Sequence, residues 1–510
     1  MRLDVMTPVS MRRPAAGWSL SLLLVAGLPW MATQAYAQGS AGVTVVPTFS
    51  LSQTLTDNRK LSSTDRQADL ITTLSPGVQI TSRSGAVQGS LTYSANGLFY
   101  AKDTSASNLQ HQLVAAGSAE LIERRLGVDA STSISQQAIS AFGTQSTSSS
   151  ADNGNRAEVV SYSLAPYLRG RLLGEADYQA RLTYSGSSSG AGSIGDTSSL
   201  SGSMGLSGTF GRFGWGLDAS RSATEYSNGR RSFSGRAGGS LSATPDPEVR
   251  VALRLARDAG DVSTGSSSVI SWGGGATWTP TPRTTLSLDA DRRYFGNSHT
   301  LSFQHRFARS SWSYSDSRSV STGAVSGGSS FSLYNIFFVQ LASLEPDPVK
   351  RDVLVRDLLR KNGLEVPSTN IGGFLTSSSS VSRTRTLTFT LQGLRDTYTL
   401  STFQSTSTSL GSSVDTGDLG QASEVRQQGI TFAFSYRLDP TSSLSVFGST
   451  QKTLDSGRLA GNDLRTLTAT WQASLGLRTQ VSLGLRYAVF DAELNPYHET
   501  ALLGSLSLRF

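Results

Sequence analysis

The C-terminal stretch Thr500-Ala-Leu-Leu-Gly-Ser-Leu-Ser-Leu-Arg-Phe510 decides the fold of this chain. Apolar side chains of one parity alternate here with polar side chains of the other: Leu502, Leu506, Leu508 and Phe510 against Ser505, Ser507 and Arg509. Successive side chains of a β-strand point to opposite faces, so this pattern predicts a strand with one apolar and one polar face. Such strands build the wall of a transmembrane β-barrel.

The N-terminal segment carries the features of an export signal. Arg12 and Arg13 precede an apolar run at residues 18–28, Pro29 ends that run, and Ala35-Tyr36-Ala37 forms a small-x-small cleavage site. The run is too short to span a bilayer as a helix. We therefore predict a cleaved signal peptide at residues 1–37, with Ala35 and Ala37 at the cleavage site, whether the chain starts at Met1 or Met11.

An exported chain that closes on an amphipathic strand is expected in the outer membrane of a Gram-negative bacterium. The aromatic C-terminus resembles the signal that the barrel-assembly machinery of these bacteria recognises. We predict that this signal comprises Leu506, Leu508 and Phe510. The predicted partners are therefore outer-membrane lipid and that machinery.

The alternation recurs through the mature chain, residues 38–510. Two clear examples are Val481, Leu483, Leu485 and Tyr487, and Ile430, Phe432, Phe434 and Tyr436. Each segment has about ten residues, the length of a tilted strand that crosses the hydrocarbon. Counting back from Phe510 predicts an all-β fold, a large closed antiparallel transmembrane barrel of about 22 strands, range 18–24, with both mature termini in the periplasm.

Two kinds of connection alternate between the expected strands. Short turns contain Gly or Pro, at residues 83–85, 211–214, 245–247, 280–282 and 439–441. Longer loops are rich in Ser, Gly, Asn and Asp, at residues 139–156, 186–197, 259–267, 410–422 and 455–462. Bacterial barrels have short periplasmic turns and long extracellular loops, so the Pro turns are expected in the periplasm.

Composition argues against several other functions. The 510 residues include no Cys and only 4 His, which leaves few groups for a metal or a catalytic base. No metal or other cofactor is predicted, and no nucleotide-binding or hydrolase motif points to an enzyme. The net charge is +7, but the basic residues are scattered among 37 acidic ones without a basic helix, which argues against nucleic acid as a partner.

One segment breaks the strand pattern. Within an insertion at residues 323–380, the spacing of five apolar residues between Glu345 and Gly363 is helical: Val349, Val353, Leu354, Leu358 and Leu359. Glu345 and Asp347 lie at its start, which favours a helix N-terminus there. Three interpretations remain open: a helix that packs on extracellular loops, a plug or constriction inside the barrel, and a docking helix in the periplasm.

A family resemblance rests on several short motifs. These are Asp69-Leu-Ile71 with Leu74-Ser75-Pro76-Gly77, the helical stretch from Asp347-Pro348-Val349-Lys350-Arg351 through Leu358-Leu359 to Asn362-Gly363, Gly373-Phe374-Leu375-Thr376, and Phe510. With them the mature chain resembles the outer-membrane β-barrel proteins associated with PEP-CTERM and exosortase exopolysaccharide loci. The resemblance implies an outer-membrane location and a link to extracellular polysaccharide. Polysaccharide and periplasmic export proteins are therefore candidate partners. The resemblance implies no catalytic residues.

Arginines on the polar parity of their strands are the candidate functional residues. They are Arg181, Arg250, Arg254, Arg306, Arg437, Arg486 and Arg509. Facing the lumen, they would attract anionic solutes and select against cations. Alternatively, they pair with lumen acids such as Asp177, Asp218, Asp289 and Asp291 and stiffen the wall. The expected function is thus a porin-like channel linked to exopolysaccharide production or export, or else a non-conducting structural or adhesion barrel that presents Ser/Gly-rich loops.

Overall fold

The structure is a computed structural model that describes residues 42–326, 351, 373–410 and 417–510, except positions 84, 149, 193, 195, 228, 263, 264 and 324. The predicted signal peptide lies outside these residues, as do its cleavage site at Ala35 and Ala37. All of the predicted insertion helix except Arg351 lies outside them as well, including Val349, Val353, Leu354, Leu358 and Leu359. The strands of the barrel lie within the described part of the chain.

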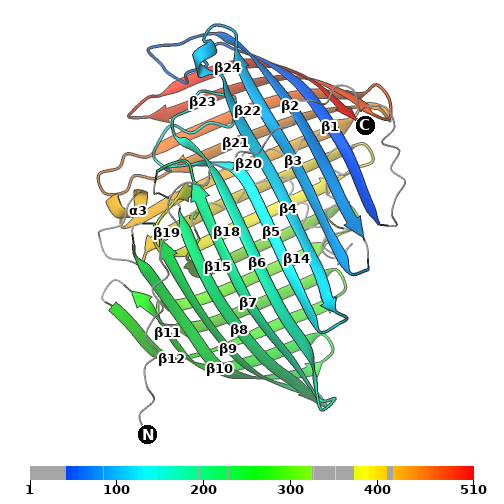
Figure 1. Ribbon diagram of the computed structural model, residues 1–510, viewed down its shortest axis with the longest axis vertical. Coiled ribbons are helices and arrows are strands. Elements are labelled where there is room, and N and C mark those ends of the chain that lie inside the picture. Colours follow the sequence, from blue (N-terminus) through cyan, green and yellow to red (C-terminus); the bar gives the residue numbers. More distant parts are fainter. Residues whose placement is uncertain are drawn as a thin grey trace. The chain divides into compact units, whose positions relative to one another are not determined.

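In the described residues, 22 antiparallel strands form one closed sheet, which confirms the predicted barrel (Figure 1). The first fifteen are β1 (Val43–Thr56), β2 (Asp69–Arg83), β3 (Val87–Tyr100), β4 (Asn108–Ile122), β5 (Leu126–Ala138), β6 (Arg156–Leu172), β7 (Ala176–Ser189), β8 (Thr197–Phe210), β9 (Phe213–Tyr226), β10 (Arg231–Asp246), β11 (Val249–Val262), β12 (Gly265–Thr281), β13 (Thr284–Arg293), β14 (Gly296–Arg306) and β15 (Ser310–Ser321). The other seven are β18 (Ser380–Gln392), β19 (Asp396–Ser409), β20 (Glu424–Arg437), β21 (Ser442–Thr453), β22 (Asn462–Ser474), β23 (Thr479–Ala492) and β24 (Tyr497–Arg509).

The C-terminal strand closes the barrel. β24 pairs with β1 from Thr48 opposite Arg509 to Thr56 opposite Ala501. The backbone N–H of Phe510 also donates to the carbonyl of Pro47, at 3.0 Å. Closure leaves no free sheet edge, so the barrel satisfies every strand's backbone groups without water, as a hydrocarbon environment requires.

The two faces of the wall differ as the alternation predicts. On β23, the outward side chains of Leu483, Leu485 and Tyr487 are half or more exposed, whereas the inward Arg486 and Phe490 are buried. Large apolar side chains are exposed in the same way around the whole barrel. Because a water-soluble monomer rarely exposes so much contiguous apolar surface, this outer face is suited to lipid.

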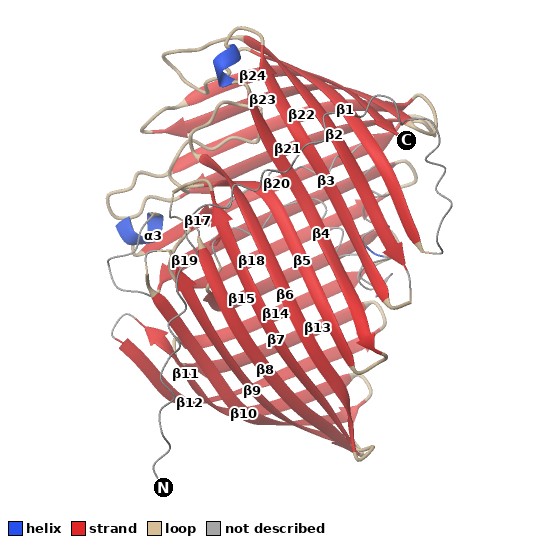
Figure 2. Cartoon of the chain, in the orientation of Figure 1, coloured by secondary structure: helices blue, strands red, loops and turns tan. Residues whose placement is uncertain are grey.

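Short connections lie at the end of the barrel where the C-terminus is, here called the C-terminal end (Figure 2). Long connections lie at the other end, near α3 (Asp418–Gln421). The prediction of a long loop at residues 259–267 is wrong. β11 continues to Val262 and β12 starts at Gly265, with Ser266 opposite Asp261 and Ser268 opposite Ala259. In a closed barrel, neighbouring strands supply ladder bonds even to a Ser-rich segment of weak intrinsic strand propensity.

Three short elements accompany the barrel in the described residues. They are the 3-10 turn η1 (Thr104–Ala106), the four-residue helix α3, and the two-stranded sheet of β16 (Val325–Ser326) and β17 (Phe374–Leu375). β16 and β17 lie within the insertion between β15 and β18 and pair with each other. No helix in the described part of the chain is long and apolar enough to span a bilayer.

Candidate functional site

The seven arginines assigned to the lumen from the sequence all have inward parity in the structure. On β11, for example, Arg250 and Arg254 alternate with Val251, Leu253 and Leu255, whose side chains are exposed on the outer face. On β24, Arg509 lies opposite Thr48, one residue from the outward pair of Leu508 and Phe49. Inward parity places these arginines on the lumen wall, but their neighbours differ.

Arg254 is held by two carboxylates from β13. Its Nη1 donates to Asp289 at 2.7 Å and its Nε to Asp291 at 3.1 Å, while Nη2 donates to the carbonyl of Gly274 at 3.1 Å. The guanidinium thus reaches across the intervening strand β12. It stiffens the wall, as the pairing interpretation expects for Asp289 and Asp291.

The glycine run on β12 makes this bridge possible. A Cβ atom at Gly273 would lie 2.0 Å from Oδ1 of Asp291, and one at Gly275 would lie 2.3 Å from Oδ1 of Asp289. Any larger residue at these inward positions would displace the carboxylates that hold Arg254. The sequence of the run gives no sign of this role, because nothing local shows that side chains of β11 and β13 meet above it.

Two more of the seven arginines have carboxylate partners. Arg181 lies 2.7 Å from Asp129 on β5, and its guanidinium lies over the ring of Tyr167. Arg486 lies 2.9 Å from Glu499 on β24, and both side chains are nearly fully buried. Neither acid was among the four expected partners, because pairing depends on which strands become neighbours.

The remaining four lack such partners. Among the described residues, no carboxylate lies within ion-pair distance of Arg250, Arg306, Arg437 or Arg509. Arg437 donates instead to the carbonyl of Leu394 at the C-terminal end of the barrel. Arg250 has an exposed side chain of inward parity, so its charge faces the lumen.

Other arginines, not selected from the sequence, complete the charged lining. Arg293 donates twice to the buried carboxylate of Asp258, at 2.9 Å each. Arg171 pairs with Asp177 at 2.8 Å, and Arg236 lies 3.9 Å from Asp218. The four acids expected to face arginines therefore do so, partly with different arginines. The alternation in the sequence already indicates that Arg171, Arg236 and Arg293 face inward. It does not indicate which inward arginines pair with carboxylates.

The lumen has two unlike walls. On β7–β13, several inward acids are exposed: Asp177, Asp218 and Asp289 have side chains 61%, 52% and 48% accessible, although Asp258 on the same wall is buried. On β19–β22, the inward side chains are mostly hydroxyls and amides and are buried, for example Ser401, Ser405, Gln427, Ser435 and Gln451. The wall of β7–β13 thus presents charged side chains to water, whereas these hydroxyls and amides of β19–β22 are buried.

A long loop crosses the end of the barrel opposite the C-terminus. Residues 139–155 leave β5 and reach strands far around the barrel. The carbonyl of Ala141 accepts from Thr453 Oγ1 at 3.0 Å and from Asn462 Nδ2 at 2.9 Å. Tyr497 Oη donates to the carbonyl of Gln145, and Tyr100 Oη to that of Ser150. This loop, the mouth loop, partly covers the lumen entrance.

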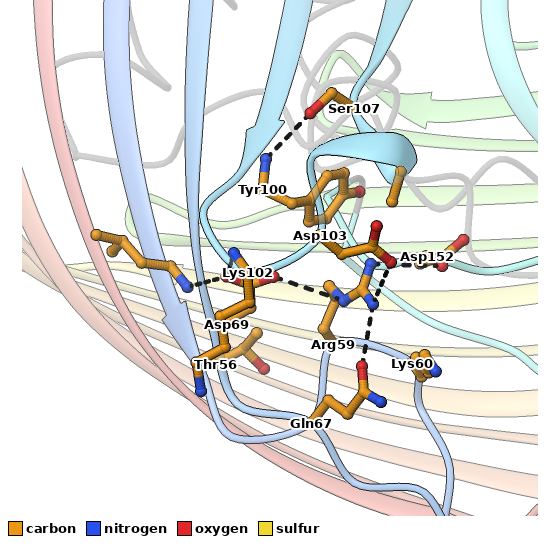
Figure 3. A network of polar contacts seen from close by, with 12 residues as sticks. Thr56, Arg59, Lys60, Gln67, Asp69, Tyr100, Lys102, Asp103, Ser107 and Asp152 are labelled. Carbon is orange, nitrogen blue, oxygen red and sulfur yellow. Dashed lines mark hydrogen bonds and ion pairs between the residues drawn. The ribbon is translucent and has the colours of Figure 1, made fainter.

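Arg59, in the β1–β2 connection, contacts both the mouth loop and the β3–β4 connection (Figure 3). The side chain is 1% exposed and lies 3.0 Å from Asp103, 3.6 Å from Asp69 and 3.8 Å from Asp152. Its Nη2 also donates to Gln67, and its guanidinium lies over the Tyr100 ring. Asp152 belongs to the mouth loop, and Asp103 to the β3–β4 connection. Arg59 is therefore a positive centre shared by three loops.

The described end of the insertion also lies at this mouth. Phe374 and Leu375 are fully buried. Phe374 packs with Ala141 and Val425, and Leu375 packs with Ala157 and Val159. These contacts are with the mouth loop and with the inward faces of β20 and β6, so the chain enters β18 from inside the barrel.

Asp418 of α3 holds the first residues of the mouth loop. It accepts hydrogen bonds from Ser140 Oγ at 2.7 Å and from the backbone N–H of Ala141 at 2.6 Å. Burial raises the pKa of this carboxyl, and the two hydrogen bonds only partly oppose that effect. The ionised carboxylate is thus destabilised where it docks the loop.

The raised pKa predicts a pH dependence. The Asp418 carboxyl binds a proton more readily when the mouth loop is docked against it than when the loop is undocked. Docking of the loop should therefore strengthen as pH falls through the raised pKa and weaken above it. Amide hydrogen exchange of residues 139–155, corrected for intrinsic rates, should show greater protection at about pH 4 than at pH 7. Asp418→Asn should make protection independent of pH. An unchanged pH dependence in Asp418→Asn would contradict this assignment.

Three of the four histidines have separate surroundings in the structure. His305 faces outward, opposite Trp312 and in edge contact with Phe307, as its parity predicts. His299 lies 3.1 Å from Asp316, and His498 contacts Arg66. Within the described residues, no cluster of three His, Asp or Glu side chains could hold a metal ion.

Fold and lining together define a transmembrane β-barrel with a charged lumen and a loop-covered mouth. No family model and no curated protein matches the chain. Among solved structures, the chain is similar to the FrpB iron transporter from Neisseria meningitidis, with 11% identity, 92% of this chain and 82% of that chain covered, and a TM-score of 0.47. It is also similar to the siderophore receptor PirA from Pseudomonas aeruginosa, with 9% identity, 91% of this chain and 80% of that chain covered, and a TM-score of 0.43. For the copper transporter OprC, the identity is 9%, the match covers 92% of this chain and 81% of that chain, and the TM-score is 0.43.

Proposed function

We propose that this protein is a channel in the bacterial outer membrane that passes hydrophilic, polysaccharide-type solutes. The observation that carries the proposal is the water-accessible charged wall of β7–β13, which offers paired and unpaired guanidinium groups to a solute. The lipid-suited outer face supports a membrane location. The family resemblance of the sequence supports the link to exopolysaccharide, with periplasmic export proteins and the barrel-assembly machinery as partners.

The lumen charges make the selectivity testable. Replacing exposed Arg250 with Ser removes a cation that has no carboxylate partner among the described residues. Replacing Arg254 with Ser leaves Asp289 and Asp291 without their shared cation. In planar bilayers, both changes should shift the reversal potential towards cations in a salt gradient, and Arg254→Ser should shift it more.

The control is Arg437→Ser, which alters a lumen-parity arginine at the C-terminal rim, whereas Arg254 lies midway along β11. It should change selectivity less than Arg254→Ser. Equal ion selectivity in the native protein and in Arg254→Ser would contradict a solute path along this wall.

A non-conducting structural barrel is the second candidate, and the mouth loop favours it because it partly covers the entrance. We would conclude that the barrel is structural if no conductance is measured for the native protein, for the Asp418→Ala variant or after deletion of residues 345–363. The polysaccharide link has its own test. Deleting the gene should abolish or strongly reduce secreted polysaccharide, and unchanged secretion would overturn the link while leaving the channel intact.

A further inference from the structure

An open groove of about 700 Å³ lies across β5–β11, lined mainly by apolar atoms. Most of its lining residues have outward parity, so the groove is on the outer face of the barrel. One row of hydrogen-bonded neighbours runs through it in the order Leu126, Leu168, Ala180, Met204, Ala219, Ala237 and Arg257. A second row runs in the order Leu182, Gly202, Arg221, Gly235 and Ala259.

The floor of the groove is made of small residues. Gly202, Ala219, Gly235 and Ala237 lie side by side where the neighbouring rows of the outer face carry large apolar side chains. A Cβ at Gly202 would have only Leu182 within 4 Å, so the space above it is open. Leu182 and Met204, which are 50% and 68% exposed, stand beside this open space. The shape of the groove and its apolar lining suit extended hydrocarbon chains.

Two arginines lie at the end of the groove towards the long loops. Arg221 and Arg257 have the outward parity of Leu217 and Leu255 and follow the exposed apolar residues of β9 and β11. Arg221 lies over the Phe233 ring, and Arg257 Nε donates to Ser268. In the described part of the chain, neither has a carboxylate within ion-pair distance. Both guanidinium groups are exposed and flank the side-chain-free position Gly235.

We infer that this groove binds a phosphate-bearing membrane lipid, with its acyl chains over the small residues and its phosphate between Arg221 and Arg257. The charge complementarity favours a lipid over a second copy of the barrel, because two copies meeting at this face would bring unpaired arginines together. Guanidinium groups bind phosphate oxygens through short charge-assisted hydrogen bonds. The location at the edge of the apolar belt is where a lipid headgroup meets its chains.

The test uses the purified full-length barrel in an uncharged detergent. Phosphatidylglycerol and a diacylglycerol with the same chains are titrated, and native mass spectrometry counts bound lipid. The native barrel should bind phosphatidylglycerol more tightly than diacylglycerol. The double variant R221Q/R257Q should lose about 30-fold in affinity for phosphatidylglycerol, at roughly 1 kcal/mol for each arginine near an anionic surface. Inorganic phosphate should not displace the lipid.

Two further variants separate the site from general electrostatics. Arg292, at the same end of the outer face but outside the groove, provides the matched control R292Q, which should bind phosphatidylglycerol as the native barrel does. Gly202→Leu fills the groove without changing charge and should weaken both lipids. Equal binding by the native barrel and R221Q/R257Q, an equal loss in R292Q, or a dimer mass that Gly202→Leu abolishes would overturn the proposal.

Discussion

Replacing Arg59 with Met should loosen the mouth of the barrel and destabilise it. The substitution removes the cation that Asp69, Asp103 and Asp152 share, while Asp69 remains 2% exposed. Removing one partner from a buried ion pair costs about 3–5 kcal/mol, because the other charge stays buried without compensation. We expect faster hydrogen exchange in residues 57–68, 101–107 and 139–155, and a larger single-channel conductance in planar bilayers.

The control for this prediction is Lys60→Met on the same loop. Lys60 pairs with Asp65 at 2.7 Å, but the two side chains are 36% and 59% exposed. Exposed ion pairs contribute about 0–1 kcal/mol, so this variant should keep the exchange and conductance of the native protein. Equal effects of the two substitutions would show that Arg59 does not join the three loops.

Replacing Glu499 with Leu should produce the second large loss of stability. Glu499 is 2% exposed inside the barrel, where it accepts from Arg486 Nη2 at 2.9 Å and from Thr56 Oγ1 at 2.8 Å. Without it, the Arg486 guanidinium is buried and uncompensated, at a cost of about 3–5 kcal/mol. The measurement is the urea concentration at which the compact, fast-migrating form in unheated SDS gels is lost.

A double replacement tests the electrostatic cause. Arg486→Met combined with Glu499→Leu removes both charges, so it should be less destabilising than Glu499→Leu alone. Asp177→Leu breaks the exposed Arg171–Asp177 pair instead and should cost about 1 kcal/mol or less. If the double variant is as unstable as the single one, packing or the Thr56 hydrogen bond would account for the loss, and not a buried charge.

Most of the barrel could be predicted from local pattern. Alternation placed Leu483 and Leu485 outside and Arg486 inside, and counting from Phe510 predicted the strand number. The same reasoning failed at residues 259–267, where abundant Ser and Gly indicated a loop but paired strands continue. Composition describes a segment alone, whereas neighbouring strands supply the hydrogen bonds that keep Ser266 and Ser268 in the sheet.

The candidate site could be predicted only in part. The inward parity of Arg250 and Arg254 was readable from the sequence, but their different surroundings were not. Arg254 is bridged to Asp289 and Asp291 over a glycine run, whereas Arg250 has no carboxylate partner among the described residues. Arg59 was not identified at all, because a lone arginine in a polar loop carries no signal that three carboxylates surround it.

The sequence by itself determined which side of the wall each strand residue faces, because alternation follows from the geometry of one extended chain. Only the tertiary structure decided which charges meet. Thr56 and Glu499 are 443 positions apart and touch because β1 closes on β24. Closure and the crossing of the mouth loop bring distant segments together, and no local pattern encodes the distance between them.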